Sequence, residues 1–177
     1  MIINREYIYD YVVQFRRAID DARDESILLR EFPSFPRGCC GDTCYLLAEF
    51  LRMNEIETIY VEGKEGDQSH AWLVVKDDRV LSPTPYTTYL PEDIRVVLSG
   101  YSGMQCESSI INANYSESDI AEGLIIDITA DQFGQVPVYV DYLKSFHKRF
   151  EFVQAHNYDN LGSFRLRELF NTIMKYI

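Results

Sequence analysis

The sequence lacks the features that define several broad classes of protein. It contains no apolar run near the ~20 residues that a membrane-spanning helix requires, so we expect no membrane segment. Basic residues are outnumbered, with 17 Lys and Arg against 28 Asp and Glu, and the formal net charge is −11. Because nucleic acids and anionic membranes repel such a surface, we expect neither as the main partner.

Cysteine is also scarce, and its four positions do not suggest a disulfide framework. Cys39, Cys40 and Cys44 cluster closely, and Cys106 lies far along the chain. Adjacent cysteines pair poorly, and the first residues lack the basic and apolar regions of a secretory signal. We therefore expect reduced thiols and a cytoplasmic location.

The chain does contain enough apolar material for a folded core. Hydrophobic residues make up 46% of the composition and aromatic residues 14%, which favours a globular protein over a disordered one. Its 177 residues suit one domain, and we find no internal repeat or linker. We predict a single α+β domain over residues 1–177.

The hydrophobic periodicity predicts both helices and strands. Apolar residues at steps of three and four predict helices at 4–24, 40–53 and 164–177, with a short one at 91–98. Strand-like runs bounded by turn residues are expected at 57–61, 70–75, 79–81, 124–128 and 136–140, while 141–152 is ambiguous.

These elements divide the domain into four parts. We expect an N-terminal helix with a Pro-rich approach (1–34), the helix and strand that carry Cys40 and His70 (35–81), an insertion (82–123), and a strand with C-terminal helices (124–177).

Three residues from separate predicted elements could form a nucleophilic triad. Cys40 opens the second predicted helix, His70 begins a strand, and Asp127 interrupts an apolar strand. A thiol in the first turn of a helix is favoured as thiolate by the exposed N–H groups, which can also stabilise an oxyanion. His70 would pair with the thiolate and later donate its proton, and Asp127 would orient the imidazole.

Asp127 provides the firmest of these signals. It lies between Ile126 and Ile128, and a carboxylate is costly to bury without a partner. Strand alternation points its side chain away from the face that the two isoleucines use. His70 is then its most economical partner.

The neighbouring cysteines offer alternatives. Cys39 is only the runner-up nucleophile, because it lies just outside the helix and would gain less from the helix dipole. Cys44 falls on the apolar face of the helix and is predicted to belong to the core. Cys39, Cys40 and Cys44 with His70 could also be zinc ligands by residue type. Zinc ligands usually come as separated pairs, and only one cluster is present, so we predict no metal and no cofactor.

Other polar and aromatic residues have weaker signals. Gln68 and Gln132 could each supply an amide to the oxyanion. Trp72 should share the face of the triad histidine and pack over the site or the core. His147 and His156 have no acidic or thiol motif nearby, so we predict solvent-side or structural roles for both.

These motifs resemble the transglutaminase-like branch of the papain-like cysteine peptidase superfamily. The family pattern G-x-C-x-D-x-A-x-L-L is matched by 38–47, with Cys44 in place of the alanine, and H-A-W-[VL] is matched by 70–73. The closing D-P-T is matched in part by 127–129. A subgroup of uncharacterised bacterial members is more similar, through 35–38 and 125–133.

The resemblance implies a papain-like α+β core, in which the nucleophile helix packs on an antiparallel sheet. It also implies that Cys40, His70 and Asp127 are the catalytic residues. The family usually places its acid a short hairpin after the histidine, whereas 56 residues separate the two here. Residues 82–123 would therefore be an insertion, and we expect it to form a flap over the cleft.

We expect a cysteine-dependent acyl-transfer enzyme that attacks a peptide or protein amide through a Cys40 thioester. With water as the acceptor it would be a peptidase, an amidase or a protein deamidase, and hydrolysis is favoured because nothing suggests a dedicated amine site. With an amine as the acceptor it would be a transglutaminase. The alternative from another class is a catalytically silent binding or immunity-type module, which the acidic surface and the insertion would suit.

Overall fold

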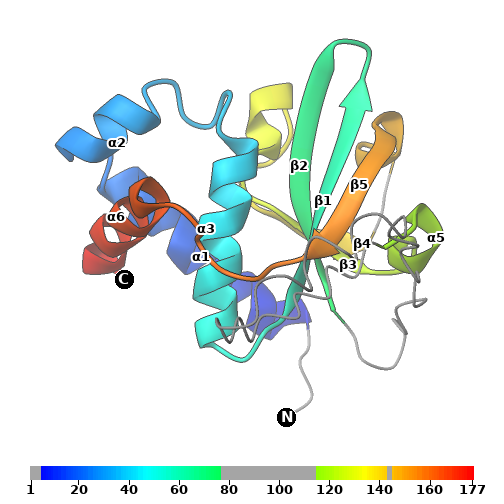
Figure 1. Ribbon diagram of the computed structural model, residues 1–177, viewed down its shortest axis with the longest axis horizontal. Coiled ribbons are helices and arrows are strands. Elements are labelled where there is room, and N and C mark those ends of the chain that lie inside the picture. Colours follow the sequence, from blue (N-terminus) through cyan, green and yellow to red (C-terminus); the bar gives the residue numbers. More distant parts are fainter. Residues whose placement is uncertain (1–4, 77–114, 143–144) are drawn as a thin grey trace, which may run out of the picture.

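The computed structural model describes residues 5–76, 115–142 and 145–177. Over these ranges the chain combines helices with an antiparallel sheet, which confirms the predicted α+β class (Figure 1). No helix in these ranges is long and apolar enough to cross a membrane. The elements predicted at 79–81 and 91–98, and most of the insertion, lie outside the described residues.

The long helices lie near their predicted positions. In chain order the helices are α1 (Arg5–Asp21), α2 (Ser26–Glu31), α3 (Cys40–Met53), α5 (Glu117–Ile120) and α6 (Phe164–Ile173), with short 3₁₀ segments η1 (Ala130–Phe133), η2 (His147–Arg149) and η3 (Met174–Tyr176). The helix α2 was not predicted. The predicted terminal helix is divided between α6 and η3.

The described strands form one sheet in the order β4-β3-β2-β1-β5, with every neighbouring pair antiparallel. Their bounds are β1 (Thr58–Glu65), β2 (Gln68–Val75), β3 (Leu124–Asp127), β4 (Tyr139–Tyr142) and β5 (Glu151–Asn157).

Three strands differ from the prediction. The strand expected at 136–140 begins later, because β4 covers Tyr139–Tyr142. The first strand was expected to end at residue 61, but β1 continues to Glu65, and the hairpin turn is confined to Gly66 and Asp67. Gly66 has a positive φ of 59°, which suits glycine in a tight turn. The strand β5 was missed because it is an edge strand with mostly exposed or half-buried side chains and no apolar alternation.

Apolar side chains cover both faces of the sheet. On one face, Leu73 and Ile126 belong to the core that α1, α3 and α6 also build. On the other face, Trp72, Ile125 and Phe150 belong to a second buried cluster. Because side chains alternate along a strand, Asp127 shares the second face with Ile125, as the alternation predicted.

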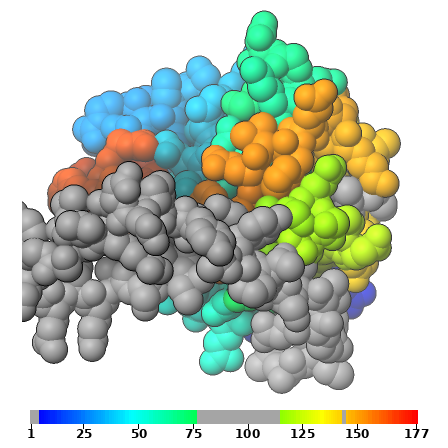
Figure 2. All heavy atoms as spheres, turned by 45° about the vertical axis from the view of Figure 1, so that its right-hand side comes forward, coloured from blue at the N-terminus to red at the C-terminus, as the bar shows by residue number. Residues whose placement is uncertain are grey.

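The described segment that leads into β3 begins beside the edge strand β5. Tyr115 donates its backbone N–H to the oxygen of Ala155 at 3.0 Å, so this segment lies beside β5, as Figure 2 also shows. Ser116 and Asp119 form a capping box at the start of α5. At Gly123 an added Cβ would clash with Val74 Cγ1, so glycine suits the position where the chain turns into β3.

Candidate active site

The carboxylate of Asp127 is the centre of a buried polar cluster. Its Oδ2 lies 2.7 Å from Nε2 of His70 and 3.1 Å from Nε2 of His147. Its Oδ1 accepts hydrogen bonds from the backbone N–H of Thr129 at 2.8 Å and from the Thr129 hydroxyl at 3.2 Å. A carboxylate has about four acceptor positions, so contacts from the described residues fill its capacity.

These contacts keep Asp127 ionised although it is only 2% exposed. Burial acts to raise the pKa of this carboxyl, but the hydrogen bonds from His147 and His70 hold the pKa well below its usual value. The structure therefore brings His70 and Asp127 together from strands that are far apart in the sequence but adjacent in the sheet.

The imidazole of His70 is fully buried beside the carboxylate. Burial alone lowers the pKa of His70, but its hydrogen bonds to Asp127 and to the Cys40 thiol outweigh burial and raise the pKa to about 9. Three aromatic rings, those of Trp72, Phe133 and Phe150, lie 4.9 to 5.8 Å from the His70 ring centroid. They fix the plane of the imidazole.

Gln132 reaches the second nitrogen of the same ring. Its Nε2 lies 3.3 Å from Nδ1 of His70. A neutral imidazole can accept from the amide there, and a charged one can donate to the amide oxygen after the side chain turns over. Gln132 is thus brought into the site, whereas Gln68 is exposed at the start of β2 and makes no hydrogen bond to the cluster within the described ranges.

The three described cysteines have different surroundings. Cys40 is the first residue of α3 and is half-buried. The thiol of Cys39 donates to the oxygen of Pro36 at 3.2 Å, and burial raises its pKa to about 11. Burial raises the pKa of the Cys44 thiol well above its usual value. Cys39 and Cys44 therefore stay protonated at neutral pH.

The helix α3 offers Cys40 the free donors of its first turn. The first intrahelical bond runs from the N–H of Thr43 to the oxygen of Cys39, so the N–H groups before Thr43 point out of the helix end. Gly41 follows the thiol, and a Cβ there would lie 3.4 Å from the Tyr60 hydroxyl.

His147 was predicted to be solvent-side or structural, and the solvent-side alternative is wrong. This side chain is 1% exposed and contacts Asp127 directly. No local motif in the sequence marks it, because its partner lies 20 residues earlier in the chain. His156, by contrast, is half-buried and hydrogen-bonded to the Tyr45 hydroxyl at 3.1 Å.

Trp72 packs against both histidines, in agreement with the predicted shared face. Its ring centroid lies 5.8 Å from that of His70 and 5.2 Å from that of His147. Trp72 and His147 also line a hollow of about 580 Å³ on this side of the sheet, together with Ile125 and Phe150.

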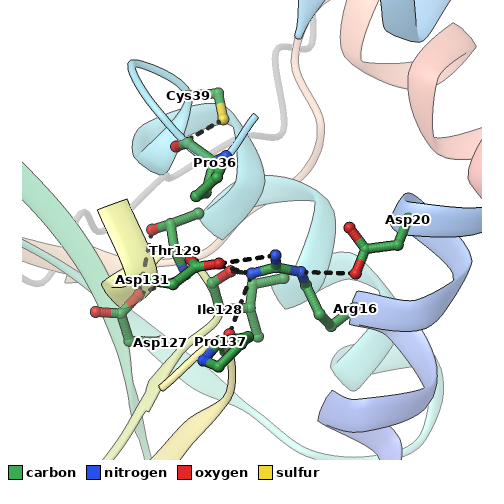
Figure 3. A network of polar contacts seen from close by, with 9 residues as sticks. All are labelled: Arg16, Asp20, Pro36, Cys39, Asp127, Ile128, Thr129, Asp131 and Pro137. Carbon is green, nitrogen blue, oxygen red and sulfur yellow. Dashed lines mark hydrogen bonds and ion pairs between the residues drawn. The ribbon is translucent and has the colours of Figure 1, made fainter. Parts of the chain in front are cut away.

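A second polar cluster holds the segment that follows Asp127. The Arg16 guanidinium of α1 donates to the backbone oxygens of Ile128 at 2.6 Å and Pro137 at 3.2 Å. It also pairs with Asp131 at 2.9 Å and with Asp20 at 3.1 Å (Figure 3). The role of Arg16 was not predicted, although an arginine next to Phe15 on an otherwise apolar helix face could have indicated it.

Residue types that can bind a metal are also present in the first cluster. Possible ligand atoms of His70, Asp127 and His147 lie within 4.8 Å of one another. Among the described residues, no other group of three or more His, Cys, Asp or Glu side chains is close enough to hold a metal ion. The zinc set considered from the sequence, with three cysteines, is not assembled there. The Nε2 atoms of His70 and His147 both lie at hydrogen-bond distance from Oδ2 of Asp127. We therefore interpret the group as a hydrogen-bonded His-Asp-His cluster.

Comparison with known proteins adds no relative: no family model, no curated protein and no solved structure matches the chain. Any function must therefore be inferred from the geometry of the site.

Proposed function

We propose that the protein is a cysteine-dependent hydrolase that cleaves a peptide or protein amide through a thioester on Cys40. The observation that carries the proposal is the buried Asp127–His70 pair, and Cys40 at the start of α3 is among the groups that raise the pKa of its imidazole. A thiolate beside a charged imidazole at a helix start is the arrangement that activates a nucleophilic cysteine.

The first half of the reaction transfers the acyl group to sulfur. The Cys40 thiolate attacks the carbonyl carbon, and the N–H groups at the start of α3 stabilise the oxyanion. The C–N bond then breaks, and the imidazolium of His70 gives its proton to the leaving amine. Asp127 remains ionised and keeps the imidazole aligned, because its oxygens are held by hydrogen bonds.

The second half releases the acyl group to water. Neutral His70 takes a proton from water, the resulting hydroxide attacks the thioester carbonyl, and the C–S bond breaks. The products are a carboxylic acid and the regenerated thiolate–imidazolium pair. Gln132, next to Nδ1 of His70, lies where its amide can orient the water or the oxyanion.

The arrangement also supports a papain-like, transglutaminase-like core as part of the proposal. In such a core a nucleophile helix packs on an antiparallel sheet whose neighbouring strands carry the histidine and the acid. Here α3 packs against β1 and β2, and His70 and Asp127 lie on the adjacent strands β2 and β3.

A mass-spectrometric screen with peptide amides tests the proposal. Incubation with a mixed peptide library, with and without a primary amine, should give cleaved or deamidated peptides and a transient acyl adduct on Cys40. Cys40→Ala should abolish both, and Cys39→Ala should retain them. Incorporation of the amine would identify a transglutaminase. Retained turnover in Cys40→Ala, or no adduct from any peptide, would reject the proposal in favour of a silent binding or immunity-type module.

A further inference from the structure

His147 has no part in the three-residue mechanism, yet it contacts the same carboxylate oxygen as His70. Its Nε2 lies 3.1 Å from Oδ2 of Asp127, and the Nε2 of His70 lies 2.7 Å from that oxygen. Both His147 and Asp127 are almost completely buried. A hydrogen bond shielded in this way from solvent is stronger than one in water, and its loss is more costly.

The direction of this hydrogen bond follows from the charge on Asp127. An ionised carboxylate can only accept, so the hydrogen must be on Nε2 of His147. Within the described residues, Nδ1 of His147 is buried without a hydrogen-bond partner. A buried N–H without an acceptor is costly, so Nδ1 carries no hydrogen and His147 adopts the Nε2–H form.

We propose that His147 is a positioning residue for the triad, whose Nε2–H holds Oδ2 of Asp127 in line with the imidazole of His70. This inference rests on the proposed function, because His147 acts on Cys40 only through Asp127 and His70. Thr129 holds the other oxygen of the carboxylate. The carboxylate is thus fixed at both ends and cannot rotate away when His70 gains or loses its proton.

The packing around His147 makes a matched substitution feasible. Its ring lies between those of Tyr139, Phe146 and Trp72, with centroid distances of 4.7, 4.7 and 5.2 Å. A phenyl ring fits among such neighbours but has no N–H to donate. A glutamine keeps an N–H donor on a flexible side chain. The two variants therefore separate the hydrogen bond from the packing.

The other titratable groups around the carboxylate come from two elements. His70 contacts it from β2, and Cys44 in α3 stays protonated, because burial and then the charge of Asp127 raise the pKa of its thiol. Burial lowers the pKa of His70, and the hydrogen bond to Asp127 and then Cys40 raise it. Removal of the His147 donor should therefore reach Cys40 through His70 alone.

The test measures the rate of iodoacetamide alkylation at Cys40 between about pH 5 and 9, where thiolate reactivity responds to the histidine. His147→Phe should slow the labelling about tenfold near pH 6 and move the acid limb of the profile to higher pH. His147→Gln should restore the rate to within about threefold of wild type. Equal profiles for wild type and His147→Phe would overturn the proposal.

A double-mutant cycle separates positioning from a merely structural role. In an Asp127→Asn background, His147→Phe should cause no further loss, because the carboxylate that it positions is absent. An additive loss in that background would contradict the proposal. His156→Gln, a change in a half-buried histidine bonded to Tyr45, is the matched control and should label like wild type.

Nitrogen–proton correlation spectra of the wild-type histidines give a readout that needs no variant to fold. They should show His147 with its hydrogen on Nε2, and a hydrogen on Nδ1 with a bare Nε2 would overturn the proposal. The proposed function fails separately if His70→Ala labels as fast as wild type. A slow His70→Ala with an unaffected His147→Phe would reject this inference alone.

Discussion

Two buried polar clusters meet at the end of β3, one around Arg16 and one around Asp127. In the first, the guanidinium is held by Asp20, Asp131 and two backbone oxygens. An arginine does not release its proton at any ordinary pH, so this charge is permanent. In the second, one carboxylate is shared by two imidazoles, and that of His70 can gain and lose a proton.

The segment after β3 is held by one cluster and contributes residues to the other. The Arg16 cluster fixes the segment that carries Thr129 and Gln132, by holding the oxygens of Ile128 and Pro137. The Asp127 cluster uses that fixed segment to align an imidazole with a thiol. Substitutions in the Arg16 cluster should therefore change the free energy of unfolding more than the reactivity of Cys40. Substitutions in the Asp127 cluster should change the reactivity of Cys40 more than the free energy of unfolding.

The largest effect should come from Asp127→Asn. An amide offers an N–H to imidazoles that need an acceptor, and it leaves His70 in the wrong tautomer to activate Cys40. Turnover on an amide substrate should fall about 10³-fold or more. Single-turnover kinetics would measure this loss. Asp131→Asn, in the structural cluster, is the matched control, and a similar loss there would remove the distinction between the clusters.

The next effect in size should come from Arg16→Met. It leaves Asp131 and two backbone oxygens without their donor and should lower the free energy of unfolding by about 3 kcal/mol. The Cys40 labelling rate should fall less than tenfold, because His70 and Asp127 keep their partners. Urea denaturation would measure the loss. Wild-type stability in this variant would show that the cluster does not hold the loop.

Stability should depend on pH through the reactive cluster. The pKa of His70 is raised from its model-compound value of 6.5 to about 9, so its contribution is complete below pH 6.5 and is lost as the pH rises through 9. The loss should be about 3 kcal/mol. Urea denaturation of wild type and Asp127→Asn from pH 6 to 10 would measure it. Equal slopes in the two proteins would contradict the raised pKa.

A smaller effect on stability should follow the substitution Gly63→Ala. Gly63 pairs with His70 across the β1–β2 hairpin. A Cβ there would lie 2.7 Å from Phe150 Cβ and 2.9 Å from Trp72 Cη2. The rings that pack against the imidazole must shift, at a cost of about 1 to 3 kcal/mol. Thermal unfolding would measure the cost. Gly66→Asn, at an open turn with positive φ, is the control, and its stability should change little.

The sequence contained strong signals where residues break a local pattern. The position of Asp127 between two isoleucines predicted that its carboxylate has a polar partner. Strand alternation correctly predicted the face of the sheet to which its side chain points. The residues of α1 and α3 showed helical periodicity because one side of each helix is buried. These signals are local, so one sequence was sufficient to find them.

The missed features depend on contacts that local sequence does not encode. His147 meets Asp127 only because η2 folds back over the second face of the sheet. The strand β5 pairs with β1 from a distant part of the chain, and its side chains do not alternate. Arg16 has a polar partner 115 positions away. Tertiary folding, rather than propensity, determines all three.

The most direct test of the central claim is the alkylation rate of Cys40 against pH, mapped by mass spectrometry, in wild type and His70→Ala. If Cys40 and His70 form a reactive pair, wild type should label at Cys40 much faster than at Cys39 or Cys44 near pH 6. His70→Ala should then lose most of that advantage. Equal labelling of the cysteines, or a rate at Cys40 that ignores His70, would contradict the account.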